Sequence, residues 1–103
     1  MARFLVTYHG SEMSHDPEAM ARARDAFMQW AGQVGGALVD PGAPIQSTRT
    51  IAANGMGDGP AEGPYSGWSV IEAPDADAAV NLLRDHPFIS RGGVLQVNQP
   101  ADV

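Results

Sequence analysis

Apolar and polar residues follow their clearest pattern toward the C-terminal end of the chain. Strand-forming residues occupy 67–73, and apolar residues then recur three or four positions apart over 76–86. Asp75 suits the N-cap of such a helix, and Pro87 would end it, because the residue before a proline disfavours helical backbone. Strand-forming residues return over 93–97. The pattern therefore predicts a strand, a helix and a second strand.

The N-terminal part of the chain shows the same order of elements. Residues 4–8 are typical of a strand, and their apolar side chains fall on both faces, which predicts burial on both sides. A long amphipathic helix is expected over 17–34, because its apolar residues recur at helical spacing. Asp16 suits the N-cap of this helix, and Gly35 suits its C-terminal end.

Two short strands and a glycine-rich segment are predicted between these parts. The first strand, 37–40, should end at Pro41, because proline interrupts a strand. The second strand covers 47–53, where threonine and isoleucine favour extended backbone. Residues 54–63 are rich in glycine and should form an exposed hairpin tip or flap.

Together these elements predict one ferredoxin-like α+β domain over residues 1–103. Its order is β-α-β-β-α-β, with an antiparallel sheet, two helices on one face and room for a small extra hairpin. In the strand 67–73, Trp68 and Val70 point one way, whereas Ile71 and Ala73 point the other. A chain this short has nothing left to cover the second face. We therefore expect a homodimer that packs sheet to sheet.

Composition narrows the classes of partner. Twelve acidic residues against six arginines give a net charge of −6, which argues against nucleic acid or an anionic membrane as a partner. The chain has no cysteine, which excludes disulfides and thiolate chemistry. It has neither a signal-peptide pattern nor the roughly 20 apolar residues that span a membrane. A cytoplasmic protein is expected.

Several short motifs resemble the YCII-related (DGPF) domain family. They are Asp58-Gly59-Pro60, residues 67–73, His86-Pro87-Phe88-Ile89 and residues 92–97. The resemblance implies a dimeric α/β barrel of ferredoxin-like topology. Some members of the family are regarded as possible enzymes, with a histidine and an aspartate in a cleft between the sheet and the helices. This chain departs from the family at its first helix, which has no histidine, and at Ala61, where a phenylalanine would complete the motif.

Three residues are candidates for acid–base catalysis. His9 ends the first strand beside Gly10, at the rim of a cleft, although a solvated loop histidine would look the same. His86 could also lie in the cleft, or its protonated ring could favour the negative end of the helix before it. Asp40 could serve as a general base at the end of its strand.

Three further residues are candidates for substrate binding. Arg49 could face Asp40 across neighbouring strands and bind an anionic substrate, or the two could form a plain cross-strand ion pair. Arg22 could bind substrate or pair with Asp25 on the helix surface. Tyr8 could offer its phenol to a ligand or lie in the core with its hydroxyl at the edge.

Other kinds of site are excluded because the sequence lacks their motifs. The three histidines lack metal-ligand spacing, the glycine-rich segment lacks the lysine of a phosphate-binding loop, and no serine-hydrolase motif is present. We therefore expect neither a metal nor a cofactor. Two functions remain open: a small cofactor-independent enzyme that performs acid–base chemistry on a small organic molecule, or a ligand-binding or regulatory dimer without catalysis.

Overall fold

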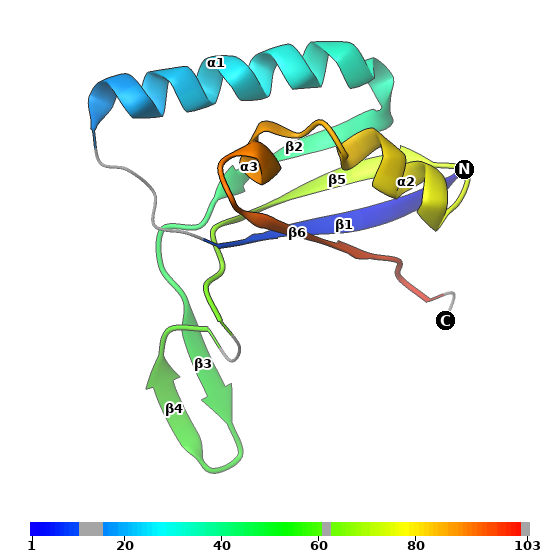
Figure 1. Ribbon diagram of the computed structural model, residues 1–103. Coiled ribbons are helices and arrows are strands. Elements are labelled where there is room, and N and C mark those ends of the chain that lie inside the picture. The colour runs from blue at the N-terminus through cyan, green and yellow to red at the C-terminus, as the bar shows by residue number, and fades with distance from the viewer. Residues whose placement is uncertain (11–15, 61–62, 102–103) are drawn as a thin grey trace.

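The computed structural model describes residues 1–10, 16–60 and 63–101. Its main feature is a four-stranded antiparallel sheet with the order β2-β5-β1-β6. The strands of this sheet are β1 (Ala2–His9), β2 (Leu38–Pro44), β5 (Gly67–Ala73) and β6 (Val94–Asn98). A separate hairpin of β3 (Arg49–Ala52) and β4 (Gly55–Asp58) projects away from the sheet (Figure 1).

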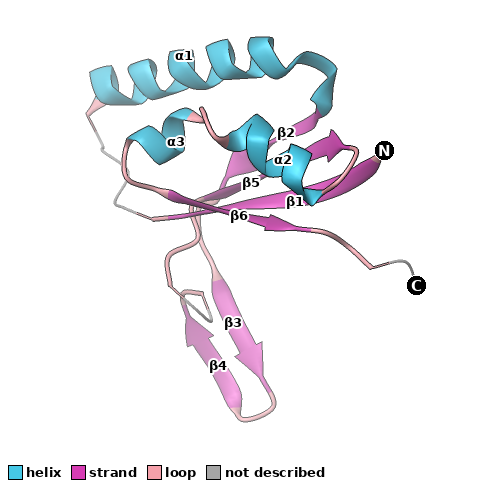
Figure 2. Ribbon diagram, turned by 45° about the vertical axis from the view of Figure 1, so that its right-hand side comes forward, coloured by secondary structure: helices cyan, strands magenta, loops and turns pink. Residues whose placement is uncertain are grey.

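All the described helices lie on one face of the sheet (Figures 1 and 2). They are α1 (Pro17–Val34), α2 (Ala76–Leu83) and α3 (Pro87–Ser90), and a short 3₁₀ turn (Gly35–Ala37) joins α1 to β2. The arrangement confirms an α+β domain with an antiparallel sheet and is compatible with the ferredoxin-like order. None of the described helices is long and apolar enough to cross a membrane.

Capping residues begin α1 and α2 and end α1 where the sequence predicts. The amide of Glu18 donates to Asp16 Oδ1 at 3.4 Å, and the amide of Ala78 donates to Asp75 Oδ1 at 2.8 Å. Each cap satisfies one of the amides that the first helical turn leaves without a partner. Gly35 ends α1 with φ of 56°. Glycine adopts this conformation without strain.

Two predicted boundaries are wrong. The helix expected over 76–86 ends at Leu83, because the chain then turns and Pro87 opens a new helix, α3, instead of only ending the old one. The strand expected to end at Asp40 continues through Pro41 to Pro44. Proline is tolerated there because β2 is an edge strand whose register with β5 shifts twice.

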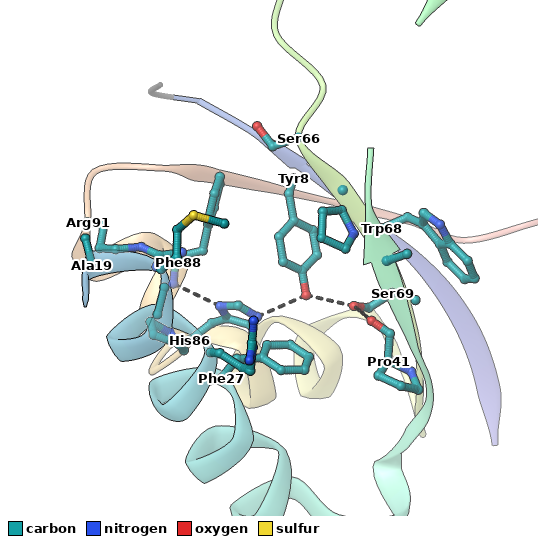
Figure 3. A pocket seen from close by; sticks show the side chains of 18 residues that line it. Tyr8, Ala19, Phe27, Pro41, Ser66, Trp68, Ser69, His86, Phe88 and Arg91 are labelled. Carbon is teal, nitrogen blue, oxygen red and sulfur yellow. Dashed lines mark hydrogen bonds between the residues drawn. The ribbon is translucent and has the colours of Figure 1, made fainter. Parts of the chain in front are cut away.

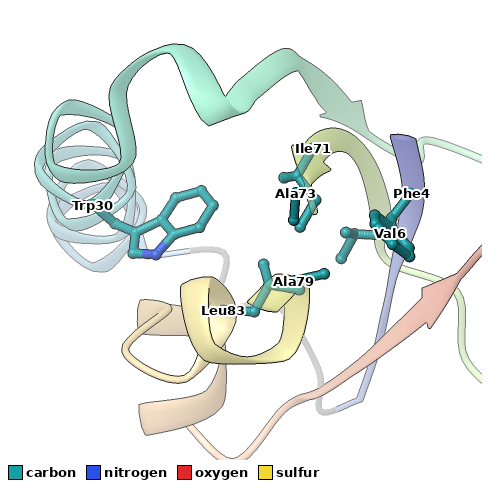
Figure 4. Packing of buried hydrophobic residues seen from close by; sticks show 7 residues of the cluster. All are labelled: Phe4, Val6, Trp30, Ile71, Ala73, Ala79 and Leu83. Atoms are coloured by element: carbon teal, nitrogen blue, oxygen red, sulfur yellow. The ribbon is translucent and has the colours of Figure 1, made fainter. Parts of the chain in front are cut away.

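The core lies between the helices and the sheet (Figure 4). Its buried members come from β1, β5, α1 and α2, and they are Phe4, Val6, Trp30, Ile71, Ala73, Ala79 and Leu83. Trp30 also connects α1 to α2, because its Nε1 donates to the carbonyl oxygen of Leu82 at 3.1 Å. In β5, Ile71 and Ala73 are buried and Trp68 and Val70 are half-buried, which confirms the predicted alternation of the two faces.

The face of the sheet away from the helices is only partly covered. Trp68 and Val70 are half-buried there, Leu5 is 39% exposed and Val94 is 61% exposed. The expectation that β1 is buried on both faces is therefore wrong for the single chain at Leu5. No described element of the chain packs over this face (Figure 1).

Candidate ligand-binding site

A cavity of about 520 Å³ lies between α1, α3 and the sheet (Figure 3). Met20, Ala23 and Phe27 line it from α1, and residues 41–44 of β2 line another side. Most of the wall is apolar, and Phe88 of α3 adds a further aromatic ring. Both the volume and the lining are typical of a site for a small organic molecule.

A chain of hydrogen bonds forms the polar part of the wall and connects four elements (Figure 3). The amide of Phe88 donates to His86 Nδ1 at 3.0 Å, and His86 Nε2 lies 3.0 Å from Tyr8 Oη. Tyr8 Oη is 2.8 Å from Ser69 Oγ, which donates to the carbonyl oxygen of Pro41 at 2.8 Å. The chain thus runs from α3 through β1 and β5 to β2.

The donor and the acceptor at the two ends of this hydrogen-bond chain determine which atom carries each proton. An imidazole nitrogen that accepts a hydrogen bond carries no proton, so the neutral ring of His86 carries its proton on Nε2 and donates to Tyr8. Ser69 uses its proton on the carbonyl of Pro41, so the Tyr8 hydroxyl donates to Ser69 Oγ. All four bonds therefore point the same way, from the Phe88 amide to the Pro41 carbonyl.

Burial keeps His86 and Tyr8, the two ionisable residues of this hydrogen-bond chain, neutral. The side chain of His86 is almost fully enclosed, and this desolvation lowers its pKa to about 4, with a further contribution from the positive charge of Arg91. Burial raises the pKa of Tyr8, and the hydrogen bond with Ser69 offsets part of that effect. At neutral pH the wall therefore carries no charge from these two residues.

His86 caps the N-terminus of α3 rather than the C-terminus of the helix before it. A protonated ring at the C-terminal end of 76–86 was one expectation. The structure instead places a neutral ring at the N-terminus of α3, where its Nδ1 accepts from the Phe88 amide. The rings of Trp30 and Phe27 pack beside it, with centroids 4.4 and 5.7 Å from the imidazole.

His9 lies outside the cavity, because alternate residues of a strand point to opposite faces and Tyr8 takes the cavity side. Its Nδ1 lies 2.8 Å from the carbonyl oxygen of Pro64, and its Nε2 lies 2.7 Å from Thr7 Oγ1. The carbonyl can only accept, so Nδ1 donates to it. His9 thus anchors the segment before β5 to the end of β1.

Asp40 and Arg49 do not face each other. β2 pairs with β5, whereas β3 pairs with β4, so Arg49 lies opposite Asp58 in the projecting hairpin. The exposed carboxylate of Asp40 accepts a hydrogen bond from the amide of Gly42 at 2.8 Å. This bond stabilises the turn of the chain there. The expected pair fails because the hairpin is inserted between β2 and β5 rather than forming part of the sheet.

Arg22 is exposed on α1 and does not line the cavity. Its Nη1 lies 3.9 Å from Glu18 Oε2, so its ion-pair partner is Glu18 rather than the expected Asp25. Of the six candidate residues, only Tyr8 and His86 meet at the cavity. Among the described residues, no group of three or more histidine or acidic side chains is placed to hold a metal ion.

Ser69, Arg24 and Arg91 are among the lining residues that were not identified in the sequence. Ser69 has a signal, because it is a polar residue on the face of β5 that Ile71 and Ala73 bury in the core. Arg24 has no such signal, because it is an exposed arginine beside the apolar stripe of α1. Arg91 follows the short helix α3 and has no periodic signal.

The chain was compared with protein-family models and with curated proteins. No protein-family model matches the chain, and a search of curated proteins gives no match.

Proposed function

We propose that the protein binds a small, largely apolar organic molecule in the cavity between α1, α3 and the sheet. The observation that carries this proposal is the chain of hydrogen bonds from Phe88 to Pro41, which lines a largely apolar cavity and has each of its protons assigned. Such a wall is rigid and polar without being charged, which suits selective binding of an organic molecule.

The same chain of hydrogen bonds favours ligand binding over acid–base catalysis. A general base needs an accessible lone pair, yet His86 Nδ1 already accepts from the Phe88 amide. A general base also works best with a pKa near the operating pH, and burial holds the pKa of His86 at about 4. Tyr8 is a poor acid for the same reason, because burial raises its pKa.

Filling the cavity from α1 should abolish binding. Ala23 lines the cavity, so Ala23→Phe places a ring in the space that the ligand needs. Phenylnaphthylamine, an uncharged apolar dye that fluoresces when it leaves water, is a suitable probe. We expect Ala23→Phe to weaken its binding by about tenfold or more, since a filled cavity forfeits the burial of the probe. Fluorescence titration measures the dissociation constant.

Ala21→Phe is the matched control, because Ala21 lies two residues away on α1, is exposed and does not line the cavity. Both changes cost the same helix propensity, so only the cavity distinguishes them. The control should bind the probe as the unaltered protein does, with one site per chain. Equal affinity in the two variants would refute the proposal, as would the absence of saturable binding to the unaltered protein.

We infer further that the chain is a YCII-related protein that forms a homodimer through the open face of its sheet. The order of its strands, with helices on one face only, supports the likeness. The open face carries Leu5, Trp68, Val70 and Val94, an apolar surface that a second copy would remove from water. Two sheets packed in this way would form the dimeric α/β barrel.

The mass in solution tests the dimer. Light scattering should give twice the 10.8 kDa of one chain. Val94→Glu should shift the mass toward that of one chain, because a buried charge is costly. Val80→Glu, at an exposed valine on α2, should leave the dimer intact. A monomeric mass for the unaltered protein, or the same shift in both variants, would count against the sheet-to-sheet dimer.

A further inference from the structure

The cavity collects positive charge in an acidic protein. Arg24 of α1 and Arg91, which follows α3, both line it, and they are two of only six arginines in the chain. No aspartate or glutamate among the described residues lines the cavity, although the chain has twelve acidic residues and a net charge of −6. The local charge is therefore opposite in sign to that of the whole molecule.

Neither of these arginines forms an ion pair within the described ranges. The ion pairs there are Arg3 with Glu72 and Arg22 with Glu18, so Arg24 and Arg91 have no acidic partner among these residues. The guanidinium carbon of Arg91 lies 5.6 Å from the centroid of the Phe88 ring. This cation–π contact holds the guanidinium beside the cavity wall.

Arg24 is an exposed residue of α1 that also lines the cavity. It lies four residues after Met20 and three before Phe27, so it shares their face of α1 and lines the cavity with them. Its apolar stem can cover the cavity wall while its guanidinium stays solvated and within reach of a ligand in the cavity.

The chain of hydrogen bonds from Phe88 to Pro41 offers no proton to an anion. His86 donates to Tyr8, Tyr8 donates to Ser69, and Ser69 donates to the Pro41 carbonyl. A carboxylate or sulfonate can only accept hydrogen bonds, so it finds no donor in this chain. Guanidinium groups are strong donors for such groups, and the two arginines supply them at the cavity.

From these contacts we propose that the ligand is an amphipathic anion. Its apolar body occupies the cavity, and its carboxylate, sulfonate or phosphate group contacts Arg24 and Arg91. Any hydroxyl or amine at its other end donates to the free lone pair of Tyr8 Oη. This inference rests on the proposed binding function and adds the chemical class and the orientation of the ligand.

A pair of dyes that differ by one charged group tests the inference. Anilinonaphthalene sulfonate carries a sulfonate on the same skeleton that phenylnaphthylamine has without it. We expect the sulfonate dye to bind the unaltered protein about tenfold more tightly at low ionic strength, as charge-assisted hydrogen bonds to two arginines imply. Added salt should remove most of this preference, because it screens exposed charges.

Arg24→Gln/Arg91→Gln should bring the affinities of the two dyes, compared within the same variant, to within about twofold of each other. The matched control is Arg22→Gln/Arg84→Gln, which changes the net charge equally at two exposed arginines outside the cavity. It should keep the preference for the sulfonate dye. Circular dichroism compares the folds of both variants with that of the unaltered protein.

Each failure has its own signature. The inference is overturned if the uncharged dye binds but the sulfonate dye binds no more tightly, or if the control loses the preference as fully as Arg24→Gln/Arg91→Gln does. The proposed binding function survives either of those results. It fails, and the inference with it, if neither dye binds or if Ala23→Phe binds both dyes as the unaltered protein does.

Discussion

Acidification from neutral pH to about pH 4 should reduce the free energy of unfolding by about 3 kcal/mol through His86 alone. The folded protein lowers the pKa of His86 from 6.5 to about 4, because the buried ring resists charge. Above pH 6.5 the ring is neutral in both states, and its full contribution to stability is present. As the pH falls toward 4, the unfolded chain takes up a proton that the folded protein does not, so stability is lost.

Urea unfolding across this pH range measures the effect, and His86→Asn isolates it. Asparagine retains an acceptor that can cap α3 but does not titrate. The carboxylates also titrate near pH 4, so the informative quantity is the difference in slope between the two proteins, in which their shared contribution cancels. If His86→Asn loses stability between about pH 6.5 and about pH 5 as steeply as the unaltered protein, then His86 does not carry the effect.

Protonation of His86 should also disturb the cavity. A charged imidazole donates from both nitrogens, so Nδ1 can no longer accept from the Phe88 amide. The new charge also repels Arg91, whose positive charge contributes to the lowered pKa. Because α3 supplies Phe88 to the cavity wall, the stability of the fold and the shape of the site depend on the same proton.

The sequence predicts the parts of the fold that short-range patterns determine. Asp16 and Asp75 cap their helices because the capping bond lies within three residues, and Ile71 is buried because alternation along a strand is local. The continuation of β2 past Pro41 could not be predicted in this way. It depends on the position of β2 at the edge of the sheet, which only the complete topology determines.

The residues of the site likewise divide into those that the local sequence indicates and those that only the complete fold brings together. Tyr8 and His86 were identified as residue types suited to a site, but their contact joins positions 78 residues apart, and no local pattern encodes it. The pairing of Asp40 with Arg49 assumed that consecutive strands are neighbours, which the inserted hairpin prevents. Ser69 could have been found, since it is a polar residue at a position whose periodicity calls for an apolar one.

Gly42→Ala should cost about 3 kcal/mol of stability, because two penalties combine at this residue. Gly42 has φ of 70°. A side chain strains the backbone in that conformation. A Cβ there would also overlap the carbonyl oxygen of Trp68, which belongs to the adjacent strand. The backbone must shift, and with it the neighbouring Pro41 carbonyl that accepts from Ser69.

Gly55→Ala separates strain from overlap. Gly55 also has positive φ, at 137°, but nothing lies within 4 Å of a Cβ placed there. Only the strain of about 1 kcal/mol should therefore be measured. Urea unfolding measures both variants, and dye titration of the folded fraction reports the cavity. Because Pro41 and Gly42 both line the cavity, Gly42→Ala should weaken dye binding, whereas Gly55→Ala, in the projecting hairpin, should not. Equal stability losses in the two variants would show that the close approach of β2 to β5 at Gly42 does not hold the cavity wall in place.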